Sequence, residues 1–404
     1  MKRMAIIPIF IPHKGCPNDC VFCNQKKITA RQKPFSAEDV SRRIEEYLPT
    51  LENRGLAVIE TAFFGGSFTG IPMEEQREYL SIAKKYKDEG RIQRIRLSTR
   101  PDYIDHGILS NLKRYGVDTI ELGAQSFDEE VLRLSNRGHG AEAIYKSAEK
   151  IKEYGFELGI QLMIGLPGDS REKSLYSAGE AVKTGPAAAR LYPTVIIKET
   201  ALYDAYMAGT YLPFSQEEML EITKDMYLIL TRAGIPVIRV GLKSTDLIND
   251  KEGSAAVAGT YHPAFRQLVC ARIAREELER QLLEQLKGRE GGGTAEKAKK
   301  AAGSMPQFAG TAATPQSAGT AAMPQSSGTA AMPQFAGTAA MPQSSGKPRL
   351  LAVMESCGES FSNMVGNRNA NRFYFEEKYP DIRFRFQRND SLPAETYKGR
   401  IVWG

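Results

Sequence analysis

Cysteine is scarce in this chain of 404 residues, which contains only five. An odd number, with three of the five inside eight residues, argues against a framework of disulfide bonds. Long hydrophobic runs are also missing, and no apolar stretch approaches the ~20 residues that a helix needs to cross a bilayer. The N-terminal stretch MKRMAIIPIFIP is interrupted by prolines, and no small-residue cleavage site follows it. We therefore expect a buried first strand, no membrane partner and a cytoplasmic location.

Charge of one sign is not in large excess either. The chain has 54 Lys and Arg against 48 Asp and Glu, a formal net charge of +6. This balance permits a nucleic-acid partner without requiring one. Hydrophobic residues make up 42% and charged residues 25%, as in ordinary globular proteins. The length suits one large domain with appendages or two ordinary domains.

A low-complexity segment divides the chain. Residues 288–347 consist largely of Ala, Gly, Ser, Thr, Pro and Gln, with a Pro-Gln pair every nine residues from Pro306 to Pro342. A nine-residue period could belong to a β-solenoid, but the repeat offers few aliphatic side chains to bury. We therefore expect a disordered linker. The remaining segments are a core over 1–245, a helical segment over 246–287 and a small α+β tail over 348–404.

Strands and helices alternate before the linker. Apolar or β-branched runs cover Met4–Phe10, Val58–Phe64, Ile92–Leu97, Val117–Leu122, Phe156–Ile164 and Arg190–Ile197. Helical patterns between them cover Ala37–Leu51, Met73–Tyr86, Asp128–Leu134, Ala141–Tyr154 and Lys173–Lys183. This alternation predicts an α/β fold with a parallel sheet, a partial (β/α)6 TIM-type barrel. Active groups in such folds lie at the C-terminal ends of the strands.

The region after the sixth run contains further elements. Ser215–Ala233 is predicted to be a helix that begins with a capping box formed by Ser215 and Glu218. Pro236–Val240 is predicted to be a strand and Pro263–Leu286 a long charged helix. In the tail, RLLAVME and DIRFRFQ are strand-like and NANRFYFEEKY is helix-like.

The stretch HKGCPNDCVFCNQ follows the first predicted strand and places Cys16, Cys20 and Cys23 in a C-x3-C-x2-C pattern. Thiolates at this density bind metal. A closed structural zinc site needs four ligands, and the other two cysteines, Cys270 and Cys357, are solitary and expected to be buried and inert. Three thiolates would leave one iron of a [4Fe–4S] cluster without a protein ligand. A zinc site completed by His13, or three buried thiols, remain alternatives.

The cysteine motif, with the aromatic Phe22 before its last cysteine, resembles that of the radical S-adenosylmethionine (radical SAM) superfamily. The resemblance implies that SAM chelates the open iron of a [4Fe–4S] cluster. It also implies that the reduced cluster cleaves SAM to methionine and a 5′-deoxyadenosyl radical. A reductant such as flavodoxin or ferredoxin would supply the electron. Phe22 could cover the cluster and exclude water.

The same resemblance implies cofactor contacts at the ends of the later strands. Gly65 and Gly66 occupy the segment that contacts the SAM amino group. Gln125 could reach the ribose, and Arg137 suits the methionine carboxylate. Ser98 stands where relatives often carry Glu, and Gln161 where they often carry a ribose-binding carboxylate. The cofactor-binding residues predicted in this way are Gly65, Gly66, Ser98, Gln125, Arg137 and Gln161.

Four segments in order along residues 5–245 are similar to the branch that contains the catalytic subunit of Elongator: STRPDYI, ELGAQSFDEEVLRLSNRGH, MIGLPG and RLYPTVIIKETALYDAYMAGTYLPFSQEE. The resemblance implies a radical SAM enzyme, and in Elongator this architecture modifies wobble uridine in tRNA. We expect a relative without the acetyltransferase domain, because no region of that length follows Thr245. The predicted function is modification of RNA, with tRNA as the possible partner.

Two other functions stay open. One is a radical SAM enzyme like coproporphyrinogen oxidase, and the other is a non-catalytic metal-binding adaptor for nucleic acid. The tail offers basic residues that could contact phosphates, namely Arg368, Arg372, Arg383, Arg385 and Arg388. A small packing unit with a solvated basic face is the alternative reading of the tail.

Overall fold

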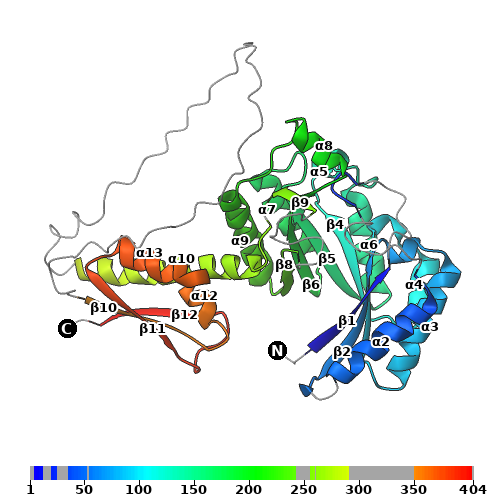
Figure 1. Ribbon diagram of the computed structural model, residues 1–404, viewed down its shortest axis with the longest axis horizontal. Helices are drawn as coiled ribbons and strands as arrows, with labels where there is room; N and C mark the ends of the chain where they lie inside the picture. Colours follow the sequence, from blue (N-terminus) through cyan, green and yellow to red (C-terminus); the bar gives the residue numbers. More distant parts are fainter. Residues whose placement is uncertain are drawn as a thin grey trace, which may run out of the picture. The chain divides into compact units, whose positions relative to one another are not determined.

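The computed structural model describes residues 4–11, 20–24, 35–51, 54–242, 255–259, 261–290 and 350–402, with side chains in the helix that ends at 290 described up to residue 288 (Figure 1). The chain forms two compact units, Met1–Ile273 and Ala274–Gly404. Cys16, His13 and residues 291–347 of the predicted linker lie outside the described residues, whereas residues 288–290, also predicted to be linker, belong to a helix. The division between the units falls inside one helix, and the four sequence segments defined above remain predictions. No helix within the described ranges is long and apolar enough to span a bilayer.

The first unit is built on a sheet of seven parallel strands in the order β1-β2-β3-β4-β5-β6-β8. The strands are β1 Met4–Ile11, β2 Val58–Gly65, β3 Arg94–Thr99, β4 Thr119–Gln125, β5 Glu157–Ile164, β6 Ala188–Pro193 and β8 Val237–Val240. The prediction of an α/β partial barrel is confirmed. The predicted strand Pro236–Val240 is confirmed as β8, and its pairing with β6 adds a seventh strand to the six predicted for the barrel sheet.

The sixth predicted run also contains two strands rather than one. β6 ends at Pro193, and β7, Val195–Ile197, pairs in antiparallel fashion with β9, Ala256–Gly259. The short helix α8, Ala201–Met207, follows β7. We call residues 195–214 the extension. It comprises β7, α8 and the segment that leads to Ser215, the N-cap of the following helix.

Helices cover one face of the sheet (Figure 1). They are α2 Ala37–Leu51, α3 Met73–Asp88, α4 His106–Arg114, α5 Glu129–Leu134, α6 Ala141–Glu153, α7 Arg171–Lys183 and α9 Gln216–Arg232. The predicted capping box is confirmed, since Ser215 accepts from the Glu218 amide and Glu218 accepts from the Ser215 amide. Three other helices, α4, α5 and α7, have a simpler N-cap, in which one side chain accepts a hydrogen bond from a backbone amide of the first turn. The capping residues are Asp105, Asp128 and Ser170.

Strand alternation separates an apolar face from a charged one. Successive side chains of a strand point to opposite faces, so residues two apart share a face. The helix-covered face carries Ile95, Leu97, Ile120, Leu122, Ile160 and Leu162, all at most 1% exposed. The opposite face carries Glu60, Arg96, Glu121 and Arg190, which are also buried. The barrel interior is therefore filled by ion pairs beneath the C-terminal ends of the strands.

The second unit begins within α10, Phe265–Glu290, which confirms the predicted long helix. Its sheet has the order β11-β10-β12, with β10 Leu350–Ser356 parallel to β11 Ile382–Arg388 and antiparallel to β12 Tyr397–Val402. The helices α12, Phe361–Val365, and α13, Ala370–Lys378, complete it. The predicted helix and both predicted strands are present, whereas β12 is an additional strand that the sequence analysis did not identify.

Candidate active site

The described part of the cysteine motif is a tight turn fastened to two other parts of the first unit. The Cys23 amide donates to the Cys20 carbonyl at 2.9 Å. The Val21 amide donates to Ser135 O at 3.2 Å, and Val21 O accepts from the Leu202 amide at 2.7 Å. Residues 20–24 are thus held between the end of α5 and the extension, beyond the C-terminal end of β1.

Phe22 contacts the extension, and its predicted role in covering a cluster stays a prediction. Its ring packs against an apolar cluster that includes Ile196, Leu202 and Tyr211 of the extension. The neighbouring Asn24 side chain donates to Glu199 O at 3.1 Å. The aromatic residue of the motif therefore anchors the loop to the extension.

Two guanidinium groups approach the sulfur of Cys20, which is only 5% exposed. Arg137 Nη1 lies 3.2 Å and Arg100 Nη1 lies 4.0 Å from Cys20 Sγ. Arg100 is oriented by Asp102, whose carboxylate accepts at 2.9 and 2.8 Å, and by the carbonyl of Arg137. Arg137 also donates to Gly123 O at the end of β4. Arg137 was among the predicted site residues, whereas Arg100, which directly follows β3, was not.

Gly65 and Gly66 lie where β2 passes the end of β1. Gly65 has φ +119°, and a Cβ atom there would lie 2.2 Å from Ile11 O. The Gly66 amide donates to the same carbonyl at 3.4 Å. Only glycine fits such a close backbone approach. The structure thus gives Gly65 a packing role, and the predicted contact of both glycines with SAM stays a prediction.

Ser98 and Gln161 are brought together through a third residue, Glu121. Gln161 Nε2 donates to Ser98 Oγ at 3.3 Å and to Glu121 Oε2 at 3.0 Å. Ser98 Oγ donates to Glu121 Oε2 at 3.3 Å. The sequence analysis missed Glu121, although a carboxylate within an otherwise apolar strand run was a visible signal.

Glu121 is the centre of a buried ion network. Its Oε1 accepts from Arg96 and lies 3.0 Å from Arg190 Nη2, while Arg96 Nε donates to Glu60 Oε2 at 2.8 Å. Burial alone would raise the pKa of Glu121, but Arg190 and Arg96 outweigh it and hold that pKa below its ordinary value. Gly159 leaves the necessary space, because a Cβ atom there would lie 2.6 Å from Glu121 Cγ. The carboxylate is therefore a fixed anchor for Ser98 and Gln161.

Gln125 ends β4 in an unusual backbone conformation. Its φ is +70°, in the left-handed region, and the register to β5 shifts between Leu122 and Gln125. A Cβ atom at Gly123 would lie 2.9 Å from Gln125 Nε2, so glycine allows the amide to fold back over the strand. Strained conformations of this kind are found at functional sites.

His139 adds an uncharged imidazole beside Arg137. Its Nε2 lies 3.3 Å from Arg137 Nη2. Burial and the charge of Arg137 lower the pKa of His139 to about 4. The imidazole is therefore neutral at pH 7. The sequence analysis did not single out this histidine.

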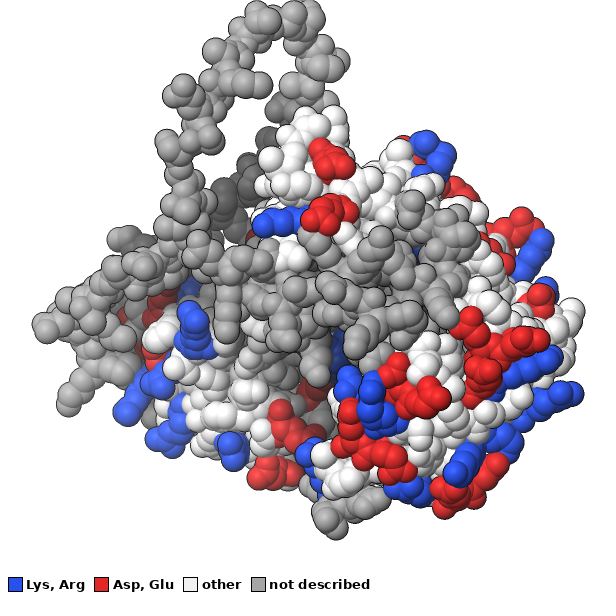
Figure 2. Space-filling model, turned by 45° about the vertical axis from the view of Figure 1, so that its right-hand side comes forward, with Lys and Arg blue, Asp and Glu red and all other residues white. Residues whose placement is uncertain are grey.

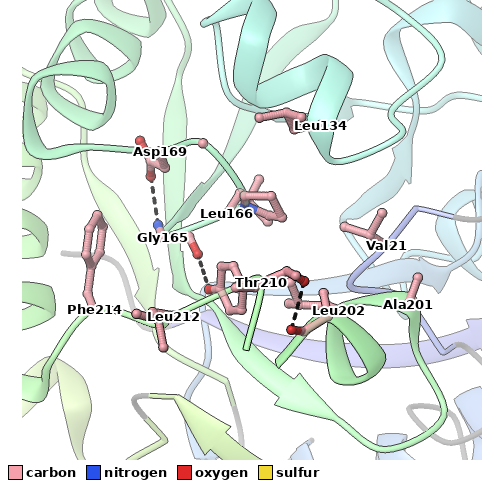
Figure 3. A pocket seen from close by; sticks show the side chains of 14 residues that line it. Val21, Leu134, Gly165, Leu166, Asp169, Ala201, Leu202, Thr210, Leu212 and Phe214 are labelled. Atoms are coloured by element: carbon pink, nitrogen blue, oxygen red, sulfur yellow. Dashed lines mark hydrogen bonds between the residues drawn. The ribbon is translucent and has the colours of Figure 1, made fainter. Parts of the chain in front are cut away.

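A cavity of about 380 Å³ lies on the other side of the cysteine loop (Figure 3). Figure 3 shows Val21, Leu134 and Leu202, from the cysteine loop, α5 and α8, around the turn that carries Leu166. The polar groups in the wall bond to one another: Asp169 accepts from the Gly165 amide at 2.7 Å, and Tyr211 donates to Gly165 O. The wall left for a ligand is accordingly more apolar than polar.

Comparison with known proteins identifies the family. The profile of the radical SAM superfamily matches residues 10–175, and that of the radical SAM C-terminal domain matches residues 186–275. The chain belongs to the radical SAM superfamily. It is therefore an enzyme of that class.

The similar proteins fall in the Elongator branch that the sequence motifs indicated. Elongator complex protein 3 of Homo sapiens is 27% identical over 320 residues, covering 67% of this chain and 56% of that protein. A tRNA uridine(34) acetyltransferase of Methanocaldococcus infernus is 26% identical over 264 residues, covering 55% of this chain and 49% of that protein. The chain spans about half the length of these curated relatives.

A solved structure shows the same fold. The archaeal Methanocaldococcus infernus Elp3 with an N-terminal deletion superposes with a TM-score of 0.53 at 22% identity, covering 69% of this chain and 64% of that one. The partial barrel described above is thus the fold of that protein.

The described residues fit the iron–sulfur cluster that the family implies. Cys20 and Cys23 lie on one turn, and the guanidinium groups of Arg100 and Arg137 favour an anionic, metal-bound sulfur at Cys20. Within the described ranges no group of three or more potential ligands gathers, because the third predicted ligand, Cys16, lies outside them. The two solitary cysteines, Cys270 and Cys357, are buried, as expected.

Proposed function

We propose that this radical SAM enzyme cleaves S-adenosylmethionine reductively and modifies RNA, with tRNA as the first candidate. The observation that carries the proposal is the Cys20–Cys23 turn, placed beyond the end of β1 with two guanidinium groups at the Cys20 sulfur. The choice of RNA is supported by the similarity to proteins whose names specify tRNA uridine as their substrate.

Cys16, Cys20 and Cys23 would hold a [4Fe–4S] cluster through three of its irons. When bound and reduced, by a donor such as flavodoxin or ferredoxin, that cluster supplies the electron that splits SAM into methionine and a 5′-deoxyadenosyl radical. Arg100 and Arg137 donate hydrogen bonds toward the Cys20 sulfur and so stabilise negative charge there. The cytoplasmic location is part of the same proposal.

Ser98, Gln125 and Gln161 would contact SAM at the strand ends, with Gly65 and Gly66 beside them. Both hydrogens of the Gln161 amide are engaged, one by Ser98 and one by Glu121. The Gln161 carbonyl oxygen is therefore the end that would accept from a ribose hydroxyl. Glu121 fixes this orientation and acts as a positioning residue. Arg137 would pair with the methionine carboxylate from its place beside Cys20.

SAM cleavage tests the first part of the proposal. The protein is reconstituted with iron and sulfide without oxygen, reduced with dithionite and incubated with SAM, and 5′-deoxyadenosine is measured by mass spectrometry. We expect production by the wild-type chain and by Cys357→Ala, which removes a buried thiol of the second unit, and none by Cys23→Ala. A fully loaded cluster that yields no 5′-deoxyadenosine would refute the proposal. One zinc per chain without iron–thiolate absorbance would instead favour a metal-binding adaptor.

Nucleoside analysis tests the RNA substrate. tRNA from cells with and without the gene is digested, and its modified nucleosides are compared by mass spectrometry. We expect one modified nucleoside to disappear with the gene and to return with a plasmid that carries the wild-type gene, but not with Cys23→Ala. Identical nucleoside profiles would exclude tRNA as the substrate.

A further inference from the structure

The sheet of the second unit has one covered face and one open face. Ile382, Phe384, Tyr397 and Ile401 belong to a buried core shared with Leu278 and Leu282 of α10. Figure 1 shows α10, α12 and α13 together on this side of the sheet. The alternate residues of β11 and β12 point to the opposite side, which the described helices do not cover.

The open face collects positive charge. It presents Arg383 and Arg385 from β11 and Lys398 and Arg400 from β12, all exposed. Val353 of β10 lies between two of them, paired with Arg385 on one side and Arg400 on the other. We call Arg383, Arg385, Lys398 and Arg400 the basic face. Figure 2 shows mainly positive side chains gathered at the lower left of the view, where the second unit lies.

Little neutralises these charges within the described residues. The acidic residue of the three strands on this face is Glu355, whose side chain is 9% exposed and lies 3.6 Å from Arg400. It also accepts from Gln387 at 2.7 Å. Arg383, Arg385 and Lys398 form no ion pair with a described residue. Three of the four cations are thus available to an anionic partner.

Two other arginines of this unit, Arg372 and Arg388, interact with neighbouring side chains away from the basic face. Arg372 pairs with Glu376 at 2.9 Å on α13, and the Arg388 guanidinium lies 5.5 Å from the Phe361 ring centroid. The basic group that the sequence suggested is therefore divided. Only Arg383 and Arg385 of that group lie on the open face, where Lys398 and Arg400 join them.

One edge of the sheet is closed to a peptide partner. Gln281 of α10 accepts from the Gly399 amide and donates to Tyr397 O, while Gln285 accepts from the Ile401 amide and donates to Gly399 O. These two side chains occupy the outer hydrogen-bonding groups of β12. A strand from another protein cannot pair there, so the basic face is what this side of the unit offers to a partner.

We propose that the basic face binds RNA through its phosphate groups. Arg383 and Arg385 are about 6.6 Å apart along β11, and β12 runs about 9.6 Å away, so the four cations form a rigid array on the scale of a nucleic-acid backbone. The described residues of this face include no aromatic side chain on which a base could stack, so the contacts are with phosphates and independent of base sequence. The choice of RNA over another polyanion rests on the proposed function.

Salt-dependent binding of tRNA to the full chain tests this inference. An unmodified, fluorescently labelled tRNA transcript is titrated by anisotropy over a range of salt concentrations. The variant Arg383→Gln/Arg385→Gln/Lys398→Gln/Arg400→Gln should bind at least about 30-fold more weakly at 0.1 M salt. The slope of log K against log salt should decrease in magnitude by about 3, because each lost phosphate contact removes about 0.7–0.9.

A charge-matched variant separates location from net charge. Arg280→Gln/Lys287→Gln/Arg368→Gln/Arg372→Gln removes the same four charges from exposed positions of the same unit outside the basic face. It should stay within about threefold of the wild type, since binding depends on contacts rather than on distant charge. Thermal unfolding of both variants checks that the sheet is intact.

Two results would overturn the inference. Equal weakening by both variants would show that affinity follows net charge alone. The second result has two parts: the wild-type chain binds phosphatidylserine vesicles, and the basic-face variant loses that binding but still binds tRNA. This result would assign the basic face to a membrane surface. Neither result bears on the 5′-deoxyadenosine assay of the wild-type chain, so this inference and the proposed function fail separately.

Discussion

Gly65 decides how closely β2 can approach the end of β1. In Gly65→Ala the new Cβ atom would lie 2.2 Å from Ile11 O in a backbone with φ +119°. We expect the free energy of unfolding to decrease by about 3 kcal/mol or more, because both the contact and the conformation are strained. Urea denaturation measures the change.

Gly90→Ala is the matched control for this prediction. Gly90 also has a positive φ, +74°, but nothing lies within 4 Å of its Cβ position. We expect a loss of about 1 kcal/mol from the conformation alone. Equal losses in the two variants would show that the contact with Ile11 O has no energetic importance.

At the scale of single residues, the sequence predicted the residues whose role follows from their immediate neighbours in the chain. Cys20 and Cys23 belong to a spacing that needs no fold to be recognised, and Gly65 belongs to a turn signal. Glu121 and Arg100 had visible signals, a carboxylate within an apolar run and an arginine directly after a strand, but these signals do not reveal a role. Their partners at the site, Cys20 for Arg100 and Arg96 and Arg190 for Glu121, lie more than 20 residues away in the sequence. His139 depends on its surroundings in the fold, which a linear pattern does not show.

The side chains Gln281 and Gln285 replace a neighbouring strand at the outer edge of β12. In Gln281→Ala/Gln285→Ala the amides of Gly399 and Ile401 lose their acceptors. Each lost hydrogen bond is worth about 1 kcal/mol, so we expect these two amides to exchange with deuterium at least about fivefold faster. Hydrogen-exchange NMR measures the two rates.

Glu284→Ala is the control on the same helix. Glu284 is exposed and pairs with Arg280 within α10. Such a surface pair contributes little, so exchange at Gly399 and Ile401 should stay as in the wild type. Unchanged rates in the double glutamine variant would contradict the role of these amides as edge partners.

At the scale of elements the sequence predicted type and position better than pairing. The six runs before residue 198 each contain a strand because their apolar residues must be buried, and the capping box fixed the start of α9. The pairing of β8 with β6, and that of the short strands β7 and β9, depend on tertiary contacts between segments that are distant in the sequence. β12 was missed because Gly399 interrupts an otherwise alternating run.

The free energy of unfolding of the whole chain should decrease on acidification because of two groups, the half-buried His139 and the buried Glu121. The pKa of His139 is lowered to about 4 by burial and by Arg137. The unfolded chain takes up this proton near pH 6.5 and the folded chain only near pH 4, so the free energy of unfolding decreases between these values. The Glu121 pKa is also lowered, so that group adds a further decrease below its ordinary value of 4.5.

Unfolding by urea at pH values from 7.5 to 4 measures this dependence. His139→Asn removes one titrating group, and its stability should fall less steeply than that of the wild type between pH 6.5 and 4.5. Glu121→Gln should be destabilised at every pH by about 3 kcal/mol, because it leaves Arg96 and Arg190 without their shared carboxylate. Parallel curves for the wild type and His139→Asn would contradict the lowered pKa of the imidazole.

Gly159 has a consequence for how this family can vary. A side chain at position 159 would occupy the space of the Glu121 side chain, whose Cγ lies 2.6 Å from the Cβ position. The two positions on β4 and β5 therefore cannot change independently. Among homologues we expect a residue as large as glutamate at position 121 only where position 159 is glycine. Where position 159 carries a larger residue, we expect a side chain shorter than glutamate at position 121.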